Sequence, residues 1–325
     1  MIHKINGMEI ITAEQPFPLI GEMAATVGFF DGVHAGHRYL LEQLRKEADA
    51  RKLPSMAITF TQYPQSILRA KFRNICLNTL DERIERLSFS GIDYCLLLDF
   101  DRPLSQLTAK DFIQQKLKKE WNIRFLLIGY DNRFGKRRLH SFRSYVKYGA
   151  DCGMEIIQAS ELPDFQVSST NIRNCLLANN LEEANRMLSY FYRLEGKVTT
   201  GDRIGRKFGF PTANIKVNDK DKILPSKGVY AAFVHSSGKK YSGMVYIGRR
   251  PTKAGRGEKR IEVHLFDFTG DLYGKNLQLE LVGFIRKEKR FGSFEDLKKQ
   301  LFSDRETAIK VLGLTCKSCE VKHKS

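Results

Sequence analysis

The chain has 325 residues, of which 42% are hydrophobic and 11% aromatic, enough to bury ordinary cores and too many for a disordered protein. It has no apolar run long enough to cross a bilayer, and its first residues lack the apolar core of a signal peptide, so we expect a soluble, cytoplasmic protein without a membrane partner. The net charge of +17 is uneven: residues 1–187 hold 25 basic and 22 acidic side chains, whereas residues 188–325 hold 29 and 15. Such a field attracts anions, whether nucleotide phosphates, nucleic acid or an anionic membrane, and does not choose among them.

The first half of the chain alternates short apolar runs with helical patterns. Five runs are predicted to be strands: Ala25–Phe30, Met56–Phe60, Tyr94–Leu98, Phe125–Ile128 and Glu155–Gln158. Apolar residues at three- and four-residue spacing predict the helices between them: 37–52, 80–90, 107–120 and 140–152. Thr79 stands three residues before Glu82, which predicts a capping box at the second helix. This alternation of strand and helix predicts a parallel sheet covered on both faces.

After a helix predicted at 181–188 the pattern changes to strands separated by turns rich in Gly, Pro and Lys. The predicted strands are Arg193–Thr199, Val229–His235, Tyr241–Ile247, Ile261–Phe268 and Leu277–Phe284. Ser236–Lys239 is predicted to be a hairpin turn, and a final helix is predicted at 293–312. Antiparallel strands followed by one helix are typical of a small barrel with a packed C-terminal helix. The change of pattern predicts two domains, 1–187 and 188–325.

The loop after the first predicted strand combines an acid, two glycines and two histidines: Asp31, Gly32, His34, Gly36 and His37. It lies where a parallel strand meets a helix N-terminus, whose free N–H groups and partial positive charge favour phosphate. The glycines let the backbone come close to a ligand, and His34 and His37 can donate hydrogen bonds to phosphate oxygens as charge grows. A satisfied histidine at a turn is the simpler interpretation of either residue alone, but the pair in this frame predicts a nucleotide site.

Residues 30–37, FDGVHAGH, resemble the signature of the bacterial bifunctional riboflavin kinase/FAD synthetases within the HxGH nucleotidyltransferases. Residues 128–135 resemble that family's second flavin- and nucleotide-contacting loop, and residues 167–173 resemble its SSTxIR element. The resemblance implies that His34 and His37 are catalytic. It implies ATP or phosphate contacts for Phe30, Asp31, Gly32, Gly36, Ser168, Ser169, Thr170 and Arg173. It implies flavin contacts for Asp131, Arg133 and Phe134.

These later stretches also have simpler interpretations. Ser168, Ser169 and Thr170 could form an ordinary helix N-cap, and the basic residues that follow Asn132 could form a solvated loop. Among the positions that depart from the family pattern, three bear on the activity of the first half: Phe29 replaces the usual Asn, Tyr63 replaces the His of Pro-His-Pro, and Asn132 replaces an aromatic residue or His. They leave open an alternative function, a riboflavin kinase whose nucleotidyltransferase domain is inactive or repurposed.

Residues 205–215 are a second candidate stretch, where Gly and Pro fix an unusual backbone path, although on composition alone an ordinary loop with a turn is the simpler interpretation. A hydroxyl and an amide, Thr212 and Asn214, then follow two residues apart, and hard oxygen ligands of this kind suit Mg²⁺ bound to nucleotide phosphates. The stretch resembles the PTAN motif of riboflavin kinases. The resemblance implies that Thr212 and Asn214 are ligands of metal and phosphate, and that Gly205 and Lys207 contact ATP.

Glu262 and His264 share one face of the predicted strand that contains them, opposite a core face. A carboxylate on a rigid strand can accept the proton of an attacking hydroxyl. The resemblance makes Glu262 the base that acts on the ribityl 5′-hydroxyl of riboflavin. Without the resemblance, an exposed strand glutamate is the simpler interpretation.

The resemblance extends from about residue 10 to residue 312. It implies an α/β plus β fold: a Rossmann-like, parallel-sheet nucleotidyltransferase domain of the HxGH type, then a small antiparallel β-barrel riboflavin kinase domain. The implied activity is phosphorylation of riboflavin to FMN, then adenylylation of FMN to FAD with release of pyrophosphate, with ATP as co-substrate and Mg²⁺ as cofactor. An alternative function of another class is nucleic-acid binding through the basic half. The sequence contains no recognition helix, zinc finger or RNA-binding signature that would support it.

Overall fold

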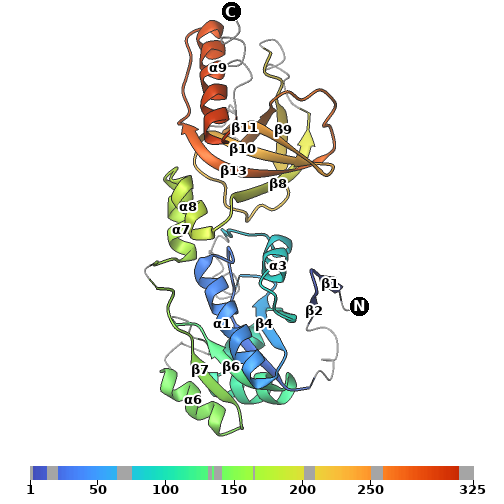
Figure 1. Ribbon diagram of the computed structural model, residues 1–325, viewed down its shortest axis with the longest axis vertical. Coiled ribbons are helices and arrows are strands. Elements are labelled where there is room, and N and C mark those ends of the chain that lie inside the picture. The colour runs from blue at the N-terminus through green and yellow to red at the C-terminus, as the bar shows by residue number, and fades with distance from the viewer. Residues whose placement is uncertain are drawn as a thin grey trace, which may run out of the picture. The chain divides into compact units, whose positions relative to one another are not determined.

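The computed structural model describes residues 3–12, 21–63, 75–130, 134, 141–163, 165–200, 209–249 and 259–314. The chain divides into two compact units, residues 1–169 and 170–325 (Figure 1). Helices α7 (Ser169–Leu177) and α8 (Leu181–Leu188) lie almost wholly in the second unit. The domain boundary expected between residues 187 and 188 stays a prediction. No helix in the described ranges is both long and apolar enough to cross a bilayer.

A seven-stranded sheet in the order β1–β2–β5–β4–β3–β6–β7 forms the N-terminal unit. Its strands are β1 (His3–Ile5), β2 (Met8–Thr12), β3 (Met23–Val27), β4 (Ser55–Phe60), β5 (Tyr94–Leu98), β6 (Ile123–Ile128) and β7 (Glu155–Gln158). Only the edge strand β1 is antiparallel to its neighbour. The parallel sheet and all five strands expected in this half are confirmed. β1 and β2 were not predicted.

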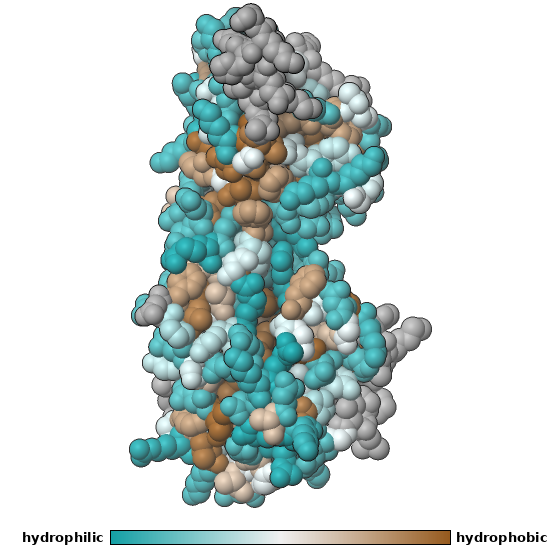
Figure 2. Space-filling view, viewed as in Figure 1, coloured by the Kyte–Doolittle hydropathy of each residue, from teal (hydrophilic) through white to brown (hydrophobic). Residues whose placement is uncertain are grey.

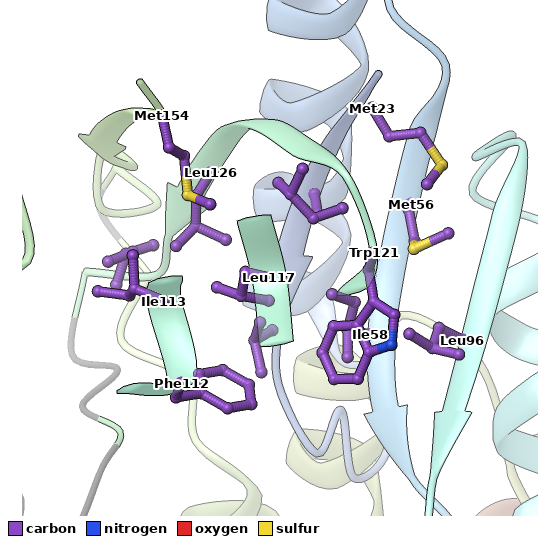
Figure 3. Packing of buried hydrophobic residues seen from close by; sticks show 14 of the residues in the cluster. Met23, Met56, Ile58, Leu96, Phe112, Ile113, Leu117, Trp121, Leu126 and Met154 are labelled. Carbon is purple, nitrogen blue, oxygen red and sulfur yellow. The ribbon is translucent and has the colours of Figure 1, made fainter. Parts of the chain in front are cut away.

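Helices cover both faces of this sheet. On one face, α1 (Ala35–Arg51) and α3 (Leu80–Ser88) pack on apolar side chains of β4 and β5. On the other, the π-helix η1 (Phe112–Glu120) and α6 (Phe142–Ala150) pack on a cluster that includes Met56, Ile58 and Leu96 (Figure 3). Because neighbouring residues of a strand point to opposite faces, strands covered on both sides must be apolar throughout. This requirement explains the continuous apolar runs of the sequence.

Two details of the helices test the sequence-based prediction. The capping box of α3 is confirmed, since Thr79 Oγ1 accepts from Glu82 N at 3.2 Å and Glu82 Oε2 accepts from Thr79 N at 3.0 Å. The helix expected at 107–120 is confirmed to within two residues, since α5 (Ala109–Asp111) continues directly into η1; the short helix α4 (Arg102–Gln106) was not predicted, and a break separates it from α5. The break has a local cause, because Leu107 is extended and Thr108 caps a new helix by accepting from the Asp111 amide.

The C-terminal unit is a closed antiparallel barrel in the order β10–β11–β12–β9–β8–β13, followed by α9 (Phe294–Val311). The strands are β8 (Tyr192–Thr199), β9 (Ala213–Val217), β10 (Gly228–Ser236), β11 (Lys239–Arg249), β12 (Lys259–Leu265) and β13 (Asn276–Arg286). The predicted barrel, its final helix and the hairpin turn at Ser237 and Gly238, both with positive φ, are confirmed. β9 was not predicted. The face seen in Figure 2 is largely hydrophilic, with a hydrophobic patch on this unit.

One buried ion pair fastens α9 to the barrel. Nε and Nη2 of Arg286, at the end of β13, donate to the Asp304 carboxylate at 2.8 and 2.7 Å. Asp304 is 1% exposed and also accepts from Gln300 at 2.9 Å. Ala308 and Ile309, on the same helix, belong to the apolar cluster at this end of the barrel. The charge pair and the apolar contacts together fix the helix on the strands.

Asp304→Ala should therefore lower the free energy of unfolding of the C-terminal unit by about 3 kcal/mol, because Arg286 loses the partner of a buried pair. The matched control is Glu306→Ala, an exposed acid of the same helix, which should change it by less than about 0.5 kcal/mol. Urea denaturation followed by circular dichroism measures both. Fluorescence of Trp121, the chain's single tryptophan, reports the N-terminal unit and should be unaffected. Equal losses in the two variants would contradict the role of the pair.

Candidate active sites

The first candidate site lies where the strand order of the parallel sheet reverses. β4 and β5 follow β3 on one side, and β6 and β7 lie on its other side. In sheets of this type, ligands bind outside the carboxyl ends of the strands at such a switch point. The loop that leaves β3 here leads directly into the N-terminus of α1, so the predicted phosphate-binding loop lies at this edge.

The backbone of this loop is held in an uncommon conformation. Phe30, Gly32 and Val33 have positive φ angles of 55°, 85° and 35°, which are unfavourable for Phe and Val. The Phe30 ring is buried, and the Asp31 carboxylate accepts from the backbone amides of Leu77 and Asn78 at 2.8 and 3.2 Å. The buried Phe30 ring and the hydrogen bonds of Asp31 thus fix the position of the loop. Their predicted contact with ATP stays a prediction.

The two histidines of the loop stack on each other, with ring centroids 3.6 Å apart and planes 16° from parallel. His34 is the N-cap of α1, and its Nδ1 accepts from the backbone N of His37 at 3.4 Å, so a neutral His34 carries its proton on Nε2. Burial, and secondarily the neighbouring His34, hold the pKa of His37 well below its usual value. Within the described residues, the buried Nδ1 of His37 has no hydrogen-bond partner. The pair therefore offers a neutral His37 imidazole, stacked on His34, beside a helix N-terminus.

Gly36 allows another part of the chain to approach this pair. A Cβ at position 36 would lie 3.0 Å from Cγ1 of Val167 and 3.4 Å from the His34 ring. Ser169, just beyond Val167, donates from Oγ to the Asp31 carbonyl at 2.9 Å. The structure thus brings the loop and the start of the predicted SSTxIR element together.

The other residues of that element are less fully placed. Ser168 is half-buried, whereas Thr170 is exposed and Arg173 half-buried on α7. Thr170 and Arg173 belong to the second compact unit. Their part in the nucleotide site stays a prediction, as does that of Ser168.

Two of the departing positions that bear on the activity of the first half contact each other. The rings of Phe29 and Tyr63 meet edge to face, with centroids 4.6 Å apart and planes at 89°. Beneath them, the Arg83 guanidinium lies 4.2 Å from the Phe29 ring centroid and donates to the Phe60 carbonyl. Arg83 is 2% exposed, and burial lowers its pKa. Phe29, Tyr63 and Arg83 therefore form one packing unit, of which only Phe29 lies close in sequence to the stacked histidines.

The predicted flavin-contacting residues are only partly covered by the structure. Asp131, Arg133 and the third departing position, Asn132, lie outside the described residues. The Phe134 ring stacks on Tyr145, with centroids 4.6 Å apart and planes 10° from parallel, and packs on the apolar cluster of the sheet. Its backbone also exchanges hydrogen bonds with the Tyr145 hydroxyl. The structure thus gives Phe134 a packing role, and its predicted flavin contact stays a prediction.

The second candidate site lies on the barrel, where β9 pairs with β12 and Asn214 stands directly opposite Glu262. Thr212 Oγ1 donates to Glu262 Oε2 at 3.1 Å. The Nε of Arg260 contacts Glu262 Oε1 and donates to Asn214 Oδ1 at 3.3 Å. The structure therefore brings the three predicted residues Thr212, Asn214 and Glu262 into one polar network. Gly205 and Lys207 lie outside the described residues.

A cavity of about 100 Å³ opens beside this network. Thr212 and Asn214 line it together with apolar and aromatic side chains that include Val198, Phe268 and Tyr273. Next to Thr212, the carbonyl of Pro211 lies 2.8 Å from Nδ1 of His264, which must therefore carry the proton. Burial lowers the pKa of His264, so its imidazole is neutral. Its hydrogen bond to the Pro211 carbonyl fixes the backbone directly before Thr212.

Sequence reasoning assigned no role to two residues beside Glu262, Arg260 and Tyr246. Arg260 lies two residues before Glu262 on β12, so the same alternation that grouped Glu262 with His264 could have found it. Tyr246 stands opposite Glu262 on β11, and its hydroxyl donates to the Glu288 carboxylate. Burial and this carboxylate raise the pKa of Tyr246. No sequence signal links Glu288 to Tyr246, because that contact depends on the barrel closing.

Comparison with known proteins agrees across both units. A family model described as FAD synthetase matches residues 19–171, and one described as riboflavin kinase matches residues 188–312. The bifunctional riboflavin kinase/FMN adenylyltransferase of Escherichia coli (strain K12) is 39% identical over 293 residues, 89% of this chain and 93% of that protein. The protein of the same name from Haemophilus influenzae is 37% identical over 288 residues, 88% and 92% of the two chains. A crystal structure named as a macrolide-efflux protein from Streptococcus pneumoniae superposes with a TM-score of 0.82 at 30% identity, covering 92% of this chain and 98% of that one.

The lowered pKa of His37 makes the stability of the N-terminal unit depend on pH. The unfolded chain takes up a proton on His37 as the pH falls through about 6.5, whereas the folded chain does so only at lower pH. The free energy of unfolding should therefore fall with decreasing pH below about 6.5, by up to about 1.4 kcal/mol per pH unit from this residue. His37→Gln should flatten this dependence, as measured by urea denaturation followed by Trp121 fluorescence. An equally steep dependence in the variant would show that His37 is not its source.

Proposed function

The chain belongs to the bifunctional riboflavin kinase/FMN adenylyltransferase family and makes FMN from riboflavin and FAD from FMN, and we propose that each step has its own site in one of the two units described above. ATP is the co-substrate of both steps. The network of Thr212, Asn214 and Glu262 serves the kinase step, and the stacked His34 and His37 serve the adenylyl transfer. The observation that carries the assignment is the convergence, in each unit, of residues that are separated in the sequence but fit one reaction.

In the kinase step, the 5′-hydroxyl oxygen of riboflavin attacks the γ-phosphorus of ATP, and ADP leaves. Glu262 accepts the hydroxyl proton as the new O–P bond forms. The carboxylate is suited to this task because its place on β12 and the hydrogen bond from Thr212 fix its position. The cavity beside Thr212 and Asn214 offers an apolar wall for part of a substrate.

Mg²⁺ fits the donor set of this site, and we take Thr212 and Asn214 as its protein ligands. Mg²⁺ prefers oxygen ligands and keeps water and phosphate oxygens around it, so it needs few side chains. When bound with ATP, the cation neutralises charge on the phosphate oxygens. The cationic Arg260 against Asn214 and Glu262 indicates that this position favours positive charge.

In the adenylyl transfer, a phosphate oxygen of FMN attacks the α-phosphorus of ATP, and pyrophosphate leaves. His34 Nε2–H and the imidazole of His37 donate hydrogen bonds to the charge that grows on the phosphate oxygens. Because the rings stack closely, two protonated imidazoles would repel each other, and the anionic phosphates favour protonation of one of them. The N-terminus of α1 adds backbone N–H groups and its dipole.

Replacement of the proposed base separates the two steps. Glu262→Gln keeps the size and the contact with Thr212 but cannot accept a proton, so riboflavin phosphorylation should fall by about 10²- to 10⁴-fold. FAD formation from FMN should be unchanged, and Glu306→Gln should leave both steps unchanged. Chromatography of flavins after single-step reactions measures each rate. Full kinase activity of Glu262→Gln would rule out this base.

The converse change is His37→Ala. It should lower FAD formation from FMN by about 10²- to 10³-fold, because a donor to the developing charge is lost, and leave riboflavin phosphorylation intact. The same chromatographic assay applies. If either variant, shown to be folded by circular dichroism, lost both steps equally, the assignment of one site to each unit would be wrong.

A further inference from the structure

Arg260 lies at the centre of the kinase site, yet the reaction proposed above gives it no role. Its Nε lies against Glu262 Oε1 and 3.3 Å from Asn214 Oδ1. The side chains of Arg260 and Glu262 are 25% and 17% exposed, so most of this ion pair is shielded from water. Shielding strengthens the attraction between the two charges compared with a pair on an open surface.

The position of the guanidinium follows from the strands around it. Residues 260 and 262 share a face of β12, and β9 lies alongside with Asn214 opposite Glu262. On the other side of β12, the residue opposite Arg260 is Gly248, over which the Tyr246 ring packs. The side chain of Arg260 therefore meets β9, where its Nε reaches both oxygens at once.

This contact conflicts with metal binding at the same place. Asn214 Oδ1 is one of the two proposed ligands of Mg²⁺, and the oxygen that binds a metal cannot keep a guanidinium 3.3 Å away without two positive charges coming close together. The nearby Glu262 carboxylate attracts either cation. The Arg260 guanidinium and Mg²⁺ therefore cannot both contact Asn214 Oδ1 without electrostatic repulsion.

We propose that Arg260 and the divalent cation compete for Asn214 and Glu262, so that the metal enters the kinase site by displacing the guanidinium. This inference rests on the proposed function, since it takes Thr212 and Asn214 as the metal ligands. Arg260 is then a positioning residue, which holds Asn214 and Glu262 together across two strands and balances the carboxylate charge until the metal arrives. If Arg260 competes with the metal, its removal strengthens metal binding. If Arg260 only organises the site, its removal leaves metal binding unchanged or weaker.

The test is a titration of the intact chain with Mn²⁺ alone, without nucleotide, in which electron paramagnetic resonance measures the free ion. Arg260→Met should bind Mn²⁺ about tenfold more tightly than the unaltered chain, because one charge-assisted hydrogen bond no longer opposes the metal. Arg260→Gln keeps a polar side chain and should shift the affinity in the same direction, which covers the case that the Met variant does not fold. Lys216→Met removes an exposed positive charge from β9 and should change the affinity by less than about threefold.

Addition of Thr212→Ala to Arg260→Met should abolish the gain, which assigns the Mn²⁺ to this site. Unchanged or weaker Mn²⁺ binding by both Arg260 variants would overturn the proposal, as would an equal gain in Lys216→Met. Failure of the competition is distinguishable from failure of the proposed function, because riboflavin phosphorylation by the unaltered chain is measured separately. An active kinase whose Arg260 variants gain no affinity for Mn²⁺ would leave the function in place and remove only this inference.

Discussion

The pairing of β9 with β12 is the constraint on which the proposed kinase site depends. It sets Asn214 opposite Glu262, brings Thr212 within hydrogen-bond distance of the same carboxylate, and gives Arg260 its two partners. Because side chains alternate along a strand, a slip of one residue would turn Glu262 to the opposite face and bring the core residue Val263 out. Burial of the alternate residues of β12 against the barrel interior therefore also fixes the chemistry on its other face.

The N-terminal unit fixes its site by a different device. The strand order reverses at β3, and the loop that leaves it is held in a left-handed path by the buried Phe30 ring and the Asp31 carboxylate. The result is a pair of stacked imidazoles at a helix N-terminus, with a neutral His37, which suits the stabilisation of phosphate charge. The barrel instead offers a carboxylate and oxygen ligands, which suit proton acceptance and a metal. The two chemistries thus match the two steps from riboflavin to FAD.

Much of this arrangement was predictable from the sequence, and the exceptions have physical reasons. Strands buried on both faces, such as Met56–Phe60, are predicted by their continuous apolar runs. The start of α3 is predicted by the capping box that Thr79 forms. β9 was missed because Ala213–Val217 contains Asn214 and a lysine in place of a regular apolar alternation. β1 and β2 were missed because they are too short to show a clear alternation, although Asn6-Gly7 between them is a strong hairpin signal. Alternation along β12 could have placed Arg260 on the face of Glu262, but its contact with Asn214 depends on the register of β9 and β12. The contact between Phe29 and Tyr63 depends on the meeting of distant segments, which spacing cannot supply.

The central claim is that one chain performs both flavin conversions. The most direct measurement is chromatography of flavins after incubation of the intact chain with riboflavin, ATP and Mg²⁺, with a parallel reaction that starts from FMN. The account predicts FMN and FAD in the first reaction and FAD in the second. FMN as the sole product of the first reaction, with no FAD in the second, would contradict it and locate the fault in the N-terminal unit. Absence of conversion in both reactions would contradict the assignment of both sites.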